Sequence, residues 1–91
     1  MAKSIMQPED EKVCYITGSQ YNLDCHHIMG GPNRKLSEKY GLKVWLRHDI
    51  HMDLHDRDND LKIRLKQEAQ KVFEEKYSHE LWMQLFRKNY L

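Results

Sequence analysis

The chain has little cysteine, no long apolar segment and almost no net charge. Only Cys14 and Cys25 are present among 91 residues, which argues against a fold held together by disulfides. No apolar run is long enough to span a bilayer and no signal peptide is recognisable, so we expect a cytoplasmic protein with reduced thiols and no membrane partner. Because 15 Lys and Arg stand against 14 Asp and Glu, net charge gives no overall signal of nucleic-acid binding.

The length of the chain suffices for one domain. A domain of this size buries a modest fraction of its surface and usually relies on a metal, a disulfide or a partner. Residues 1–12 are polar and aperiodic, which predicts a flexible leader and leaves residues 13–91 as the single domain. There are no repeats or low-complexity tracts. With so few thiols, histidine is the residue type that could supply a metal site.

Four of the six histidines occur in two tight groups, Asp24-Cys25-His26-His27-Ile28 and His51-Met52-Asp53-Leu54-His55. Residues four apart share one face of a helix, so His51 and His55 could direct two imidazoles at one point. Neighbouring residues on a strand point to opposite faces, so His26 and His27 must have different roles. The economical hypothesis is that one of this pair completes a three-histidine metal site and the other is a general base. The alternatives are a core histidine and a surface histidine.

The apolar pattern predicts an α+β fold. Residues 13–16 and 21–28 have strand character on either side of a turn, which predicts a β-hairpin. Residues 42–46 alternate as a half-buried strand does, after a polar and basic loop that begins with Gly-Gly-Pro. Three helices are expected: one that Asp49 caps and that carries the second histidine group, one from residue 59 or 60 to 77, and one over residues 80–86 capped by Ser78.

Positive charge is concentrated between the two histidine groups. Over residues 30–47 the charged residues are Arg34, Lys35, Glu38, Lys39, Lys43 and Arg47. Phosphate is the natural partner of such a segment, so we expect DNA to be bound mainly through its backbone by Arg34, Lys35, Arg47 and His48. The planar guanidinium of Arg34 can engage two oxygens at once. His48 could instead be a fourth metal ligand or an exposed residue.

These features together resemble the HNH endonucleases and their ββα-metal finger, also called the His-Me finger. The resemblance rests on His-His-Ile in a strand, the loop over residues 30–42, a short apolar strand and His-x-x-x-His. The loop and the ending Lys-Asn-Tyr-Leu resemble small phage-encoded members, and the likeness covers residues 13–91. The histidine spacing is most like that of the colicin-type DNases. Carried over by position, it implies that His26, His51 and His55 bind the metal and that His27 is the base.

The resemblance implies a metal-dependent DNA endonuclease of phage DNA metabolism, acting in the host cell cytoplasm. His27 would take a proton from water, the hydroxide would attack phosphorus in line, and one divalent ion would stabilise the phosphorane and the leaving 3′-oxygen. The product would carry a 5′-phosphate. Three imidazoles favour zinc, nickel, cobalt or manganese over magnesium, although magnesium supports some members of the family.

The chain departs from the family pattern at a second metal site. Many relatives hold a structural zinc with two Cys-x-x-Cys pairs, of which only Cys14 remains here. Thr17, Arg47 and Ile50 stand at the other three positions, and Cys25 does not replace them. We therefore expect no second metal.

A second departure concerns the asparagine that helps to orient the base, which would fall near Gly41. Glycine has no side chain for this work, so Asn33 or a backbone carbonyl would have to replace it. Two other functions therefore stay open: a catalytically weak or inactive metal finger that binds nucleic acid, and a phage protein-interaction module with a structural metal. The sequence also leaves open a protein partner or a homodimer.

Overall fold

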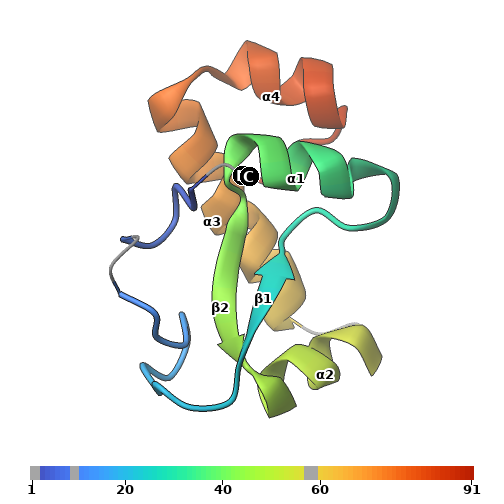
Figure 1. Cartoon of the computed structure of the whole chain (residues 1–91). Coiled ribbons are helices and arrows are strands. Elements are labelled where there is room, and N and C mark those ends of the chain that lie inside the picture. The colour runs from blue at the N-terminus through green and yellow to red at the C-terminus, as the bar shows by residue number, and fades with distance from the viewer. Residues whose placement is uncertain (1–2, 9–10, 57–59) are drawn as a thin grey trace.

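The computed structural model of the chain describes residues 3–8, 11–56 and 60–91, apart from the side chains of His55 and Asp56. Within these ranges, β1 (Leu23–His27) and β2 (Lys43–Arg47) form an antiparallel sheet with helices arranged around it (Figure 1). The expected α+β class is therefore confirmed. The strand predicted over residues 42–46 is β2, shifted by one residue.

Helices fill the connection between the strands and the rest of the chain after them. A short 3-10 turn, η1 (Gly31–Asn33), leads into α1 (Arg34–Tyr40) before β2 begins. After β2 come α2 (His48–Asp56), α3 (Asp60–Lys76) and α4 (His79–Phe86). The three helices after β2 agree with the sequence prediction. None of the described helices is both long and apolar enough to cross a bilayer.

α1 lies where the sequence predicted a loop. Leu36 and Tyr40 are four residues apart and both pack against the core, which gives this short helix one apolar face. Ser37 is fully buried between them, and its hydroxyl donates to the carbonyl oxygen of Met29 (2.9 Å) and accepts from its N–H (2.8 Å). The helix ends at Gly41, whose φ of 71° is left-handed. Two apolar residues in a basic segment were too weak a periodic signal to predict a helix.

The strand predicted over residues 13–16 is wrong, and with it the tight hairpin to residues 21–28. Turns form there instead: the N–H of Gly18 donates to the carbonyl oxygen of Cys14, and the N–H of Cys14 donates to that of Ser19, both at 2.8 Å. The thiol of Cys14 is buried and accepts N–H groups from Thr17 (3.5 Å) and Arg47 (3.3 Å). The chain therefore wraps around this sulfur rather than extending along a neighbour.

The core lies between the sheet, α3 and α4. Val44 and Leu46 of β2 are buried, as the alternation of residues 42–46 predicts. The central rings are Phe73 and Trp82, both fully buried with centroids 5.4 Å apart. Burying a side chain of this size contributes roughly 1.5–3 kcal/mol. α4 begins at the predicted cap, since the hydroxyl of Ser78 accepts the N–H of Leu81 at 3.0 Å.

The leader contributes contacts that its composition did not suggest. Within the leader, the N–H of Ile5 donates to the carbonyl oxygen of Gly41 (2.9 Å), and the side chain of Gln7 accepts the N–H of Trp45 (2.8 Å). Residues 3–7 therefore lie along the edge of β2 that β1 does not pair with. A Cβ added at Gly41 would collide with the carbonyl oxygen of Lys3, so the leader occupies the place where a side chain of residue 41 would be.

Candidate functional site

The inner face of β1 carries the first predicted metal ligand. His26 pairs in register with buried Val44, so its ring is on the side of the sheet that faces the helices. Its centroid lies 5.2 Å from that of His51 in α2, with the rings edge to face. The structure thus brings together two of the three predicted ligands. The third is His55, whose side chain lies outside the described residues.

Asp24 lies on the same face of β1 and links two histidines. Its Oδ2 is 3.0 Å from Nδ1 of His51 and 2.7 Å from Nδ1 of His48. Because an ionised carboxylate can only accept, the Nδ1 of each ring is the donor in these two hydrogen bonds. The hydrogen bond from His51, followed by that from His48, holds the pKa of Asp24 below its usual value. Carboxylates behind metal-binding histidines fix their rings in this way.

Sequence reasoning missed Asp24, although a signal was available. Asp24 stands two residues before His26, and residues two apart share a face of a strand. Within the described part of the chain, no three His, Cys, Asp or Glu side chains are arranged to hold a metal ion. That finding covers only two members of the predicted trio. The two imidazoles and the supporting carboxylate suit a divalent transition metal.

The outer face of β1 carries the predicted base. Nε2 of His27 is 2.8 Å from Oε2 of Glu38 in α1, and the two side chains are 16% and 31% exposed. Nζ of Lys43, which is opposite His27 in the sheet, donates to both oxygens of Glu38 at 3.0 and 3.2 Å. The hydrogen bond from His27, followed by that from Lys43, lowers the pKa of Glu38. Because an ionised carboxylate can only accept, Nε2–H of His27 is the donor in its hydrogen bond to Glu38.

Glu38 is thus the hydrogen-bond partner that the structure gives to His27. The sequence suggested Asn33 or a backbone carbonyl for this place and treated Glu38 only as the one acid of a basic segment. Gly41 cannot contribute, because the leader covers it. The Leu36–Tyr40 spacing is a signal for the helix that carries Glu38, but it does not by itself place Glu38 beside the strand.

A cavity of about 350 Å³ lies beside both histidines of β1. Its described lining residues come from β1, the turn after it, α2 and α3, and are His26, His27, Ile28, Gly30, Gly31, Leu54, Lys62 and Lys66. The cavity is within the size range of small-ligand sites. The cavity thus brings residues of the histidine strand and two lysines of α3 together.

The four predicted DNA contacts lie in two separate places. Arg34 and Lys35 are exposed at the start of α1. Arg47 and His48 are near the other end of the sheet, where they line a different cavity of about 600 Å³. Arg47 pairs there with both oxygens of Asp49, at 2.6 and 2.9 Å. Asp49 lies inside the first turn of α2 rather than before it, so its prediction as the N-cap is wrong.

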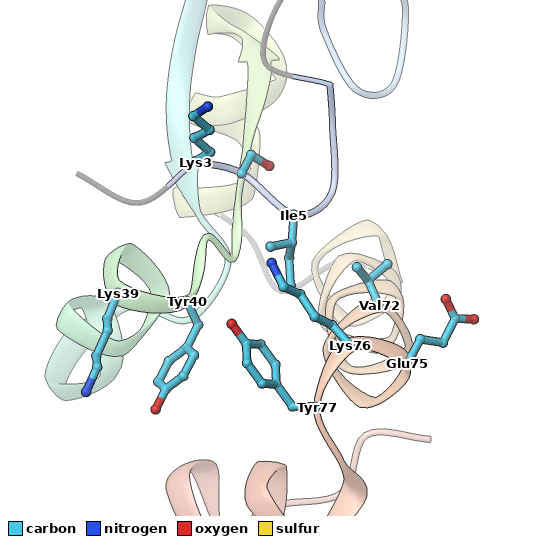
Figure 2. A pocket seen from close by; sticks show the side chains of 9 residues that line it. Lys3, Ile5, Lys39, Tyr40, Val72, Glu75, Lys76 and Tyr77 are labelled. Carbon is cyan, nitrogen blue, oxygen red and sulfur yellow. The ribbon is translucent and has the colours of Figure 1, made fainter.

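The larger cavity in Figure 2 lies away from the histidines. It measures about 660 Å³ and is lined by the leader and by the C-terminal ends of α1 and α3. Tyr40 and Tyr77 meet edge to face there, with centroids 5.6 Å apart. Figure 2 shows Lys3 and Lys39 pointing away from one another. The charged groups do not converge, so this cavity offers space without an arranged set of reacting side chains.

Comparison with known proteins finds no match. Neither a family model nor a curated protein nor a solved structure matches the chain. The chemistry available is a pair of imidazoles backed by Asp24, a third imidazole backed by Glu38, and one cavity that His26 and His27 share. Proton transfer and metal binding are the tasks for which imidazoles in such pairings are suited.

Proposed function

We propose that the chain is a metal-dependent DNA endonuclease of the HNH type, which hydrolyses phosphodiester bonds with His27 as the general base. One observation carries the proposal: the two adjacent histidines of β1 have separate partners and yet line the same cavity. His26 lies against His51, and His27 is hydrogen-bonded to Glu38. A metal ligand and a base need this combination of separate partners and a shared substrate space.

His26, His51 and His55 would hold one divalent ion. Asp24 supports this assignment, because its contact with Nδ1 of His51 makes Nε2 the nitrogen of that ring that would bind the metal. When bound, the ion supplies Lewis-acid stabilisation of the charge that develops on the phosphate and the leaving oxygen. Three imidazoles favour zinc, nickel, cobalt or manganese.

His27 would take the proton from the attacking water through Nδ1. Glu38 accepts the Nε2–H and so fixes both the tautomer and the orientation of the ring. Lys43 contacts both oxygens of Glu38 and keeps that carboxylate in place and ionised. The base would then need no side chain at position 41, where the family has its asparagine.

Two features outside the cavity support an HNH-like ββα core. The order β1, β2, α2 places the histidine groups on the first strand and on the helix, as the resemblance requires. The sulfur of Cys14 accepts N–H groups from Thr17 and Arg47. These are two of the three positions at which many relatives have further zinc-binding cysteines. The backbone around Cys14 thus has the close approach that such a zinc site needs.

A plasmid-nicking assay with Mg²⁺, Mn²⁺, Ni²⁺ and Zn²⁺, each with and without chelator, tests the proposal. We expect nicking that the chelator abolishes and that His27→Ala abolishes in the presence of metal. The glycine at position 41 favours the second candidate, a metal finger that binds nucleic acid without turnover. That candidate gains if the wild type cleaves no duplex, single-stranded or branched DNA with any of the four metals.

A further inference from the structure

We propose that Lys62 and Lys66 of α3 form a phosphate-binding wall that holds the DNA backbone in the cavity beside His26 and His27. The inference rests on the proposed function and names residues that would hold its substrate. The sequence predicted the DNA contacts elsewhere, at Arg34, Lys35, Arg47 and His48.

The first support is position. Lys62 and Lys66 are four residues apart in α3, so they lie on one face about a turn from each other. Both are half-buried and both line the cavity with the strand histidines. Gly30 and Gly31 form another part of its lining, and a Cβ at either one would meet no atom within 4 Å. The cavity is therefore not closed by side chains at these two positions.

The second support is charge. The described residues that line the cavity include two lysines and two histidines. An ammonium is a compact point charge with three donors, suited to phosphate. Each phosphate of DNA carries a negative charge that two such groups can neutralise. The metal ligands and the base would then act on a phosphodiester already held from the opposite side.

The third support is the way in which Lys66 is held. Its Nζ lies 5.4 Å from the centroid of the Tyr90 ring, within the range of a cation–π contact. The backbone of Tyr90 is itself fixed on α3: its carbonyl oxygen accepts from Gln67 (3.0 Å) and its N–H donates to Gln70 (2.7 Å). The C-terminal segment thus restricts the motion of the Lys66 side chain.

The same helix offers a matched control. Lys71 and Lys76 are also in α3 and are exposed, but neither lines the histidine cavity. The double changes Lys62→Gln with Lys66→Gln, and Lys71→Gln with Lys76→Gln, remove equal charge from one helix. Only the first pair removes it from the proposed wall.

The test is the salt dependence of binding to a short duplex, measured by fluorescence anisotropy in the presence of chelator, so that no cleavage occurs. Each phosphate contact contributes about 0.9 to the slope of log affinity against log salt. The Lys62→Gln, Lys66→Gln protein should therefore have a slope shallower by about 1.8. The wild type should lose about tenfold more affinity than this variant between 50 and 200 mM salt. A pair of Lys→Arg changes at the same positions should restore the wild-type slope.

The control variant should keep a slope closer to that of the wild type. Equal slopes for the two double variants would overturn the inference, because the effect would then reflect net charge alone. An unchanged slope in the Lys62→Gln, Lys66→Gln protein, with a circular dichroism spectrum like the wild type, would also overturn it. Because binding is measured without metal, absence of nicking would count against the proposed function and not against the wall.

Discussion

Each face of β1 brings a histidine and a carboxylate together, but in a different way. On the inner face, a carboxylate two residues from His26 contacts Nδ1 of His51, a histidine of another element. On the outer face, Glu38 contacts Nε2 of the strand histidine His27 itself, and a lysine contacts the same carboxylate. Adjacent residues of a strand point to opposite faces, so the rings of His26 and His27 meet different neighbours. The proposed division between ligand and base follows from that separation.

The largest effect should come from the inner face. Changing His51→Ala removes a ligand, so metal content, activity and thermal stability should fall together. A metal present at 100 times its dissociation constant stabilises the fold by about 2.7 kcal/mol, and this gain should vanish. Metal analysis and melting curves with and without Zn²⁺ measure it. A variant that still binds one equivalent, and still melts higher with metal, would remove His51 from the site.

A change on the outer face should lower the cleavage rate without lowering the metal content. Changing His27→Ala should lower kcat by roughly 10²- to 10⁴-fold, because that is the usual cost of losing a general base. Metal content and DNA affinity should stay near those of the wild type. Single-turnover cleavage, together with anisotropy under chelator, separates these readouts. If the variant cleaves as fast as the wild type, the base lies elsewhere and His48 becomes the next candidate.

The two carboxylates give the sharpest comparison. Changing Asp24 should lower the metal affinity, and changing Glu38 should lower kcat, each by roughly 10- to 100-fold, as losing the partner of a functional histidine does. The loss in Asp24→Asn should disappear at high metal concentration, because the defect is in metal affinity. The loss in Glu38→Ala should persist in kcat at any metal concentration, with KM little changed.

Glu38→Gln is the matched variant for the outer face, since its amide oxygen can still accept the Nε2–H of His27. It should recover much of the rate lost in Glu38→Ala. If high metal concentration restored the cleavage rate of Glu38→Ala, then Glu38 would also act through metal affinity, as Asp24 does. An unaltered rate in Glu38→Ala would leave Glu38 a purely structural residue.

The smallest effect should come from Arg34, which is exposed at the start of α1. Changing Arg34→Ala should weaken binding a few-fold and about equally for unrelated DNA sequences, as the loss of a backbone contact does. Anisotropy with two duplexes of different sequence measures this. A loss confined to one duplex would indicate base readout instead.

The features that the sequence predicted correctly are those that a local pattern of residues determines. The stripe through Leu65, Ala69 and Phe73 predicted α3, and Ser78 predicted the start of α4, because both signals lie within a few residues. The closeness of His26 and His51 was also predicted, from the spacing of the two histidine groups and the family resemblance. These signals need no knowledge of distant contacts.

The rest depends on contacts that a linear pattern does not contain. Val13 to Ile16 has strand character, but the buried sulfur of Cys14 bends this segment through hydrogen bonds from turn and strand backbone. Glu38 reaches His27 only because α1 forms, and α1 has just two apolar residues to predict it. For Lys62 and Lys66, the helical period predicts a face, but it does not predict that a cavity lies in front of that face.

The leader closes one edge of the sheet without adding a strand. At the centre of β2, the N–H of Trp45 is bonded to the side chain of Gln7 (2.8 Å), and its carbonyl oxygen accepts the N–H of Tyr15 (2.8 Å). Bare edges of sheets are templates on which other chains pair and aggregate. With both polar groups of Trp45 occupied, this position offers no backbone partner to a strand from another molecule.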